Sequence, residues 1–131
     1  MKIMVCYDGS EAAESALKLA KEHAEIFKTG IFIVTALEGS AQEQLGSLEK
    51  VELLLDDAKI LLASDTIDVE TKLLQANNLG VGENLVIFAR ENGVKEIIIG
   101  LKKLSKVGKL ITGSTAQHVI LHAECPVVAV K

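Results

Sequence analysis

Aromatic residues are scarce in this chain of 131 residues: they make up 3% of it, and tryptophan is absent. Hydrophobic residues nevertheless make up 49%, so the core must be aliphatic, built from Ile, Leu, Val and Ala. A chain of this length reads most naturally as one domain, and it is long enough to bury such a core. We therefore expect a single domain over residues 1–131.

Other absences exclude whole classes of protein. No run of 18 apolar residues occurs, so we expect no membrane span. The chain enters a strand-like pattern at Lys2 without the apolar stretch of a signal peptide, which predicts a cytoplasmic location. A net charge of −4 argues against a general nucleic-acid binder, which normally presents a basic face. Cysteine is limited to Cys6 and Cys125, and their apolar surroundings predict buried, reduced thiols.

Acidic residues are also missing from one long segment, residues 97–123, although the chain as a whole is acidic. The segment opens with an apolar triplet that stops at Gly100, and it reaches a helix start at Gly113. The loop between them carries the basic residues Lys102, Lys103, Lys106 and Lys109. A basic loop with glycines, placed between a buried strand and a helix start, is typical of a phosphate site.

Strand-like and helix-like patterns alternate along the whole chain. Apolar runs predict strands over residues 1–7, 31–37, 67–75, 95–99 and 126–130. Helical spacing of apolar residues predicts helices over residues 11–28, 42–63, 83–91 and 114–122. Regular alternation with short loops indicates the α/β class, a parallel sheet with helices on both faces.

Individual segments carry finer predictions. Ser10 is placed to cap the first helix. The leucine run at residues 53–55 widens the apolar face of the second helix and predicts that this helix is well covered. Residues 67–75 alternate apolar and polar side chains, which is typical of an edge strand, whereas the continuous apolar run at 95–99 indicates a central strand.

Two residues after strands lie at the same edge of the predicted sheet. Asp8 follows the first strand and Gly100 follows the fourth, and parallel sheets of this class bind ligands at the carboxyl ends of their strands. Asp8 could accept hydrogen bonds from ribose hydroxyls, or it could form a local turn that leads into the first helix. Gly100 could serve a ligand or simply permit a turn.

The chain resembles the universal stress protein family over essentially its whole length. The resemblance rests on the segments at residues 5–10, 97–100, 113–116 and 125–127. It implies a Rossmann-like open sheet of five parallel strands in the order 3-2-1-4-5, with helices on both faces. It also implies a homodimer joined through the last strand. Many members bind ATP, some with a divalent ion such as Mg or Mn, and others bind no nucleotide.

ATP-binding members of that family carry the pattern G-x2-G-x9-G-[ST] after the fourth strand. Gly100, Gly113 and Ser114 match this pattern at the family's spacing, whereas Lys103 occupies the position of the second glycine. The resemblance also implies base and ribose contacts after the first, second and fourth strands. Those positions are Tyr7, Asp8, Ala36, Ile99 and Gly100.

The start of the last predicted helix suits an anion on physical grounds. Its unpaired N–H groups and the positive end of the helix dipole favour a phosphate, and Ser114 or Thr115 could add a hydroxyl donor. A plain Gly-Ser cap without a ligand is the alternative. The side chain of Lys103 could block a phosphate, or its ammonium group could replace the missing backbone contacts.

Other nucleotide and metal chemistries find little support. A Walker A motif around Gly108 would need glycine at Lys103 and Ser or Thr at Leu110. His118 and His122 are spaced as a possible metal pair, but no third ligand is evident, so we interpret them as ordinary helix residues. No arrangement of nucleophile, base and electrophile for hydrolysis is legible.

The sequence is compatible with three functions. The first is an adenine-nucleotide (ATP) binding module with a stress-response or regulatory role and without fast turnover. The second is a nucleotide-free dimeric interaction protein, suggested by Lys103. The third is a weak ATPase, supported by nothing beyond the predicted pocket. The apolar last strand lies at a predicted edge and invites pairing with a second copy of the chain.

Overall fold

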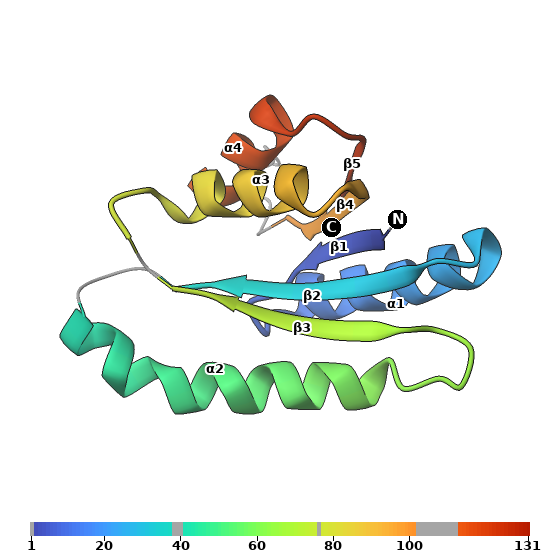
Figure 1. The fold of residues 1–131 in the computed structure, drawn as a ribbon, viewed down its shortest axis with the longest axis horizontal. Helices are drawn as coiled ribbons and strands as arrows, with labels where there is room; N and C mark the ends of the chain where they lie inside the picture. The colour runs from blue at the N-terminus through green and yellow to red at the C-terminus, as the bar shows by residue number, and fades with distance from the viewer. Residues whose placement is uncertain (1, 38–40, 76, 102–112) are drawn as a thin grey trace, which may run out of the picture.

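The structure, a computed structural model, describes residues 2–37, 41–75, 77–101 and 113–131, without the side chains of residues 41–47. Five strands alternate with four helices along the described chain (Figure 1). The elements are β1 (Lys2–Cys6), α1 (Glu11–Phe27), β2 (Gly30–Ala36), α2 (Ala41–Leu61), β3 (Val69–Leu74), α3 (Val81–Glu91), β4 (Val94–Gly100), α4 (Ser114–His122) and β5 (Val127–Val130).

All five strands form one parallel sheet in the order β3-β2-β1-β4-β5, which confirms the predicted fold. β1 lies at the centre, paired with β2 on one side and β4 on the other. The sheet is therefore wound in both directions from β1, and the winding reverses between β1 and β4. Ligands of doubly wound sheets bind beyond the carboxyl ends of the strands at such a reversal.

Two aliphatic cores separate the sheet from its helices. α1 and α2 cover one face, and α3 and α4 cover the other (Figure 1). Alternate residues of each central strand supply the two cores, because successive strand side chains point to opposite faces. In β2, for example, Ile33 is fully buried against α1 and α2, and Val34 is fully buried on the other face.

α1 begins as predicted. The Ser10 hydroxyl accepts a hydrogen bond from the Ala13 N–H at 3.1 Å, the arrangement of an N-cap. The inward face of the helix consists mainly of alanines, so α1 can approach the sheet closely. The helix ends at Lys28, which takes the left-handed conformation with φ of 54°. This end agrees with the helix predicted over residues 11–28.

The predicted coverage of α2 is wrong on one side. Leu55, Ala58 and Leu62 are buried against the sheet, but Leu53 is 65% exposed. Two positions turn a helix by about 200°, so a residue two places from a buried leucine faces the opposite side. Ile60 and Leu61 are likewise exposed. A single layer of sheet covers a single stripe of the helix, and the leucine run exceeds that stripe.

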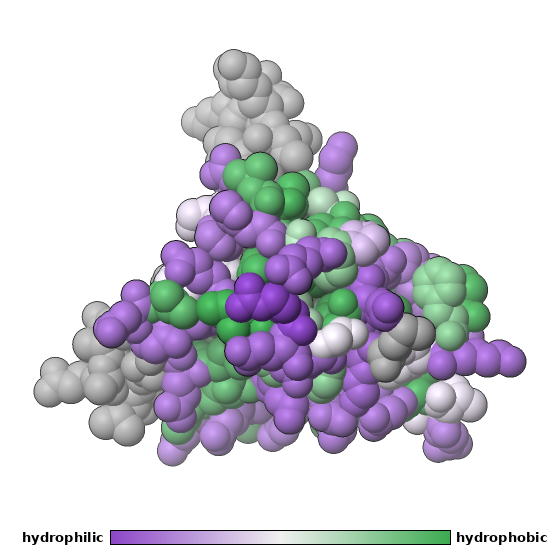
Figure 2. Space-filling view, turned by 45° about the horizontal axis from the view of Figure 1, so that its top comes forward, coloured by the Kyte–Doolittle hydropathy of each residue, from purple (hydrophilic) through white to green (hydrophobic). Residues whose placement is uncertain are grey.

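The outer surface carries mostly polar side chains on the face presented in Figure 2, with apolar side chains in smaller groups between them. Among the described residues, no helix combines the length and the apolar character needed to cross a membrane.

Candidate functional site

A cavity of about 320 Å³ opens at the carboxyl edge of the sheet, above the reversal between β1 and β4. The ends of β1, β2 and β4 form its floor, and the first turns of α1, α3 and α4 contribute to its walls. Every predicted site residue within the described chain lines it: Tyr7, Asp8, Ala36, Ile99, Gly100, Gly113, Ser114 and Thr115. Their roles toward a ligand stay predictions.

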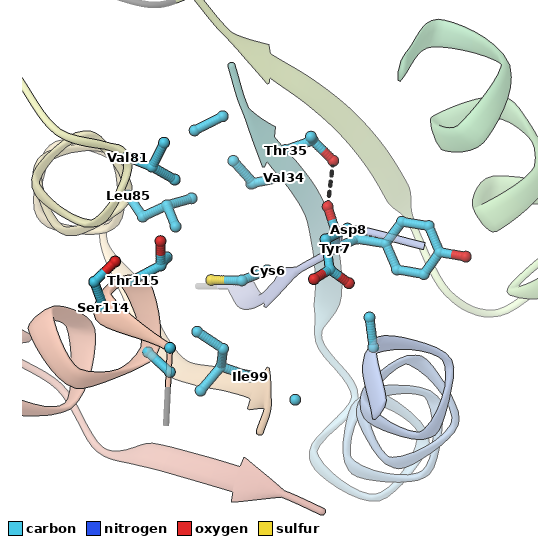
Figure 3. Close-up of a pocket in the computed structure, with 15 residues that line it drawn as sticks. Cys6, Tyr7, Asp8, Val34, Thr35, Val81, Leu85, Ile99, Ser114 and Thr115 are labelled. Atoms are coloured by element: carbon cyan, nitrogen blue, oxygen red, sulfur yellow. Dashed lines mark hydrogen bonds between the residues drawn. The ribbon is translucent and has the colours of Figure 1, made fainter. Parts of the chain in front are cut away.

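The wall formed by α4 is rich in hydrogen-bond donors. Gly113 is the N-cap of α4 with φ of −64° and ψ of 159°, and it has no side chain to cap the helix. The first N–H groups of a helix have no partner within it, so this end presents backbone donors and the positive end of the helix dipole. Ser114 and Thr115 lie on the same side of the cavity (Figure 3). This wall can hold an anion.

Asp8 lies on the opposite side of the cavity from Ser114 and Thr115 (Figure 3). One carboxylate oxygen, Oδ1, accepts a hydrogen bond from the Ser10 N–H at 2.9 Å. This bond is the local turn considered in the sequence. It also holds the carboxylate in place, so the local turn and a role toward ribose are compatible. The carboxylate is an acceptor, so this side of the cavity suits a group that carries hydrogen-bond donors.

Tyr7 and Cys6 direct their side chains to opposite faces of the sheet. The Tyr7 ring points away from the cavity into the layer between the sheet and α1 and α2, so the residue lines the cavity with its backbone (Figure 3). The Cys6 sulfur points into the cavity instead (Figure 3). Alternation along β1 explains this, because neighbouring strand residues point to opposite faces.

The Cys6 thiol at the cavity and the Tyr7 phenol on the other face of the sheet both stay neutral at ordinary pH. Burial, with a smaller contribution from the charge of Asp8, raises the pKa of the Cys6 thiol to about 12. Burial also raises the pKa of the Tyr7 phenol, helped by the negative charges of Glu14, Asp8 and Asp57. The thiolate is the nucleophilic form of cysteine, so the Cys6 thiol has little nucleophilic character.

Gly100 is required for packing rather than for a turn. Its φ is not positive, since the positive-φ glycines of the described chain are Gly9 and Gly93. A Cβ on Gly100 would lie 2.6 Å from the Ala12 carbonyl carbon and 2.8 Å from the Ala12 Cβ. The missing side chain thus lets the first turn of α1 rest on the end of β4, which closes one wall of the cavity.

Lys103 lies outside the described residues, as do Lys102, Lys106 and Lys109. The two interpretations of Lys103 both remain predictions.

His118 and His122 stack with ring centroids 4.3 Å apart. In the described part of the chain, no group of three or more His, Cys, Asp or Glu residues could hold a metal ion. Both cysteines are free thiols, as predicted, but both are half-buried rather than buried.

Several lining residues escaped the sequence reasoning: Cys6, Ala13, Val34, Thr35, Val81, Leu85 and Ala116. Val34 could have been found, because it shares a strand face with Ala36. No pattern in the sequence indicated that Val81 and Leu85 would line the cavity. They reach the cavity because α3 packs against α4 across Gly82, where a Cβ would lie 2.8 Å from His118 Cβ.

The strand order and the position of the cavity define a Rossmann-like α/β domain with its cavity at the reversal of winding. The chain belongs to the universal stress protein family, because the model described as "Universal stress protein family" matches residues 1–131.

Individual relatives match nearly the whole chain. A universal stress protein of Methanocaldococcus jannaschii is 30% identical, with 99% of this chain and 81% of the relative covered. The solved structure of a universal stress protein from Archaeoglobus fulgidus matches with a TM-score of 0.89 and 32% identity, covering 100% of this chain and 98% of that one. Another from A. fulgidus, in complex with dAMP, has a TM-score of 0.83 and 27% identity, with 100% and 98% covered.

Proposed function

We propose that this protein binds ATP in the cavity at the carboxyl edge of the sheet and serves a stress-response or regulatory role. One observation carries the proposal. The donor-rich start of α4 and the Asp8 carboxylate face each other across a cavity of about 320 Å³. This volume is within the usual range for small-molecule sites, roughly 300–1,000 Å³. A phosphate suits the first wall and ribose hydroxyls suit the second.

The relative whose structure is a complex with dAMP supports an adenine nucleotide as the ligand. Apolar side chains beside the polar walls, among them Val34, Leu85 and Ile99, suit the faces of a base. We propose that a Mg or Mn ion enters with the triphosphate, held mainly by the phosphate oxygens. Magnesium is commonly held this way, by substrate phosphates and one or two carboxylates.

Binding without fast turnover fits the chemistry of the lining residues. Cys6 and Tyr7 stay protonated near neutral pH, and one oxygen of Asp8 is engaged by the Ser10 N–H. The described lining therefore offers no evident general base or activated nucleophile for hydrolysis. A cytoplasmic location fits the two free thiols, since reduced cysteines are the rule in that compartment.

Thermal unfolding with and without ATP tests the proposal. A ligand that binds the folded state alone, present at a hundred times its Kd, stabilises that state by about 2.7 kcal/mol. For a domain of this size the melting temperature should rise by roughly 10 °C. Tripolyphosphate and adenosine, each alone, should give smaller rises. No shift with millimolar ATP, together with no nucleotide released from the purified protein, would favour the nucleotide-free interaction protein.

We also propose that two copies pair through β5, so that the sheet continues across the dimer. β5 lies at an edge of the sheet, bonded to β4 on one side, and its valines are half-buried. An apolar edge strand of this kind invites pairing with another chain.

A proline at position 129 tests this dimer directly. Val130 directs its carbonyl oxygen to β4, where it accepts from the Leu101 N–H at 2.6 Å, so the Ala129 N–H points outward. Ala129→Pro removes that outward donor and keeps the ladder to β4. Light scattering should give twice the chain mass of 14.0 kDa for wild type and Ala129→Ser, but the single mass for Ala129→Pro. A monomeric wild type at micromolar concentration would refute the dimer.

A further inference from the structure

The strand ladder between β1 and β2 ends in an irregular way at the floor of the cavity. The Tyr7 N–H donates to the Val34 carbonyl oxygen at 2.9 Å, which continues the parallel ladder one residue beyond β1. In a regular parallel ladder, the next bond would run from the Ala36 N–H to the Tyr7 carbonyl oxygen. The Thr35 hydroxyl occupies that acceptor instead, donating to it at 2.6 Å (Figure 3).

Because the Thr35 hydroxyl takes the place of a ladder bond, one backbone donor is left unpaired at the carboxyl edge of the sheet. The N–H groups of Ile31 and Leu37 donate to carbonyl oxygens on the β3 side of the sheet. Successive N–H groups along a strand point to opposite sides, so the Ala36 N–H points toward β1. Among the described residues, it has no acceptor. Ala36 also lines the cavity. The free N–H therefore lies where the ladder stops and the cavity begins.

We propose that Thr35 is a positioning residue for the ligand. Its hydroxyl holds the Tyr7 carbonyl oxygen, and the Ala36 N–H thereby stays free to donate to an acceptor atom of the nucleotide. The Thr35 hydroxyl satisfies the Tyr7 carbonyl oxygen at the end of the strand pair and leaves the Ala36 N–H without a partner. A further ladder bond would satisfy the same carbonyl oxygen but would use the Ala36 N–H. The ligand in this inference is the nucleotide of the proposed function, and that part of the inference rests on the proposed function.

Valine tests this role because it has the shape of threonine without the hydroxyl. In Thr35→Val, the Ala36 N–H is expected to pair with the Tyr7 carbonyl oxygen. Hydrogen exchange followed by NMR should then show the Ala36 amide slowed in the variant without ligand, compared with wild type. Affinity for ATP should fall about tenfold, the effect of one lost hydrogen bond.

Thr35→Ser is the matched control, because serine retains the hydroxyl. It should restore rapid exchange at Ala36 and bring ATP affinity back to within about threefold of wild type. A role confined to stability would lower the melting temperature of Thr35→Val without slowing exchange at Ala36.

Unchanged exchange at Ala36 in Thr35→Val would overturn the inference, and so would unchanged ATP affinity or a failure of serine to restore it. A wild-type protein that binds no ATP would refute the proposed function, and the ligand half of this inference with it. The exchange comparison, made without ligand, would still decide whether Thr35 keeps the Ala36 N–H free.

Discussion

Gly113→Asp is expected to lower the affinity for ATP by about a hundredfold while the fold stays intact. Gly113 already has the extended conformation of an N-cap, with φ of −64° and ψ of 159°, which aspartate adopts without strain. The new carboxylate would accept from the Thr115 or Ala116 N–H, the donors proposed for phosphate. It would also repel the phosphate charge. Losing charge-assisted hydrogen bonds at about 1.5–3 kcal/mol each accounts for the factor.

Stability and affinity should move in opposite directions in this variant. A capping aspartate stabilises a helix by about 1 kcal/mol relative to a poor cap, and glycine falls within a few tenths of the good caps. Urea unfolding should therefore show unchanged or slightly greater stability, while calorimetry shows weaker binding. Gly113→Asn separates the loss of the N–H donors from the charge repulsion, because asparagine occupies the same donors without a charge. Its affinity for ATP should fall about tenfold. Wild-type affinity in Gly113→Asp would mean that phosphate does not bind at the start of α4.

Gly100→Ala is expected to lower the free energy of unfolding by about 2–3 kcal/mol, the upper part of the range for overpacked sites. The added methyl group would lie 2.6 Å from the Ala12 carbonyl carbon. The obstacle is helix backbone rather than the end of a flexible side chain, so α1 itself must shift. Denaturant unfolding followed by circular dichroism measures the loss.

Gly80→Ser is the matched control for this substitution. Gly80 is the N-cap of α3 with φ of −71°, and a Cβ there would have no neighbour within 4 Å. Serine is a favoured cap, so stability should stay the same or rise slightly. If Gly100→Ala unfolds at the wild-type denaturant concentration, the contact between α1 and β4 does not demand glycine. The packing account of Gly100 would then be wrong.

Local patterns in the sequence predicted most of the fold. Ser114–His122 was predicted to the residue, because a Gly-Ser start and a regular apolar spacing mark both ends of α4. The Ser10 cap and the buried alanine face of α1 were confirmed for the same reason. Such signals depend on residues within one or two helical turns of each other, so they can be recognised directly in the sequence.

Predictions failed where the outcome depended on distant segments. Leu53 looked like a core residue, but the sheet covers a single stripe of α2 and leaves it exposed. Val81 and Leu85 reach the cavity through the packing of α3 on α4, which no local pattern encodes. The sequence also did not indicate that the Tyr7 ring points into the layer between the sheet and α1 and α2, so that Tyr7 lines the cavity with its backbone.

The order of strands and helices, the aliphatic core and the edge of the sheet that carries the cavity all follow from hydrophobic periodicity and turn residues, which act over short stretches of chain. The orientation of each lining group does not. Cys6 rather than Tyr7 faces the cavity, Gly100 accommodates α1, and Thr35 takes a carbonyl oxygen from the ladder. Each of these depends on strand register and on the close approach of segments far apart in sequence, and tertiary packing sets both.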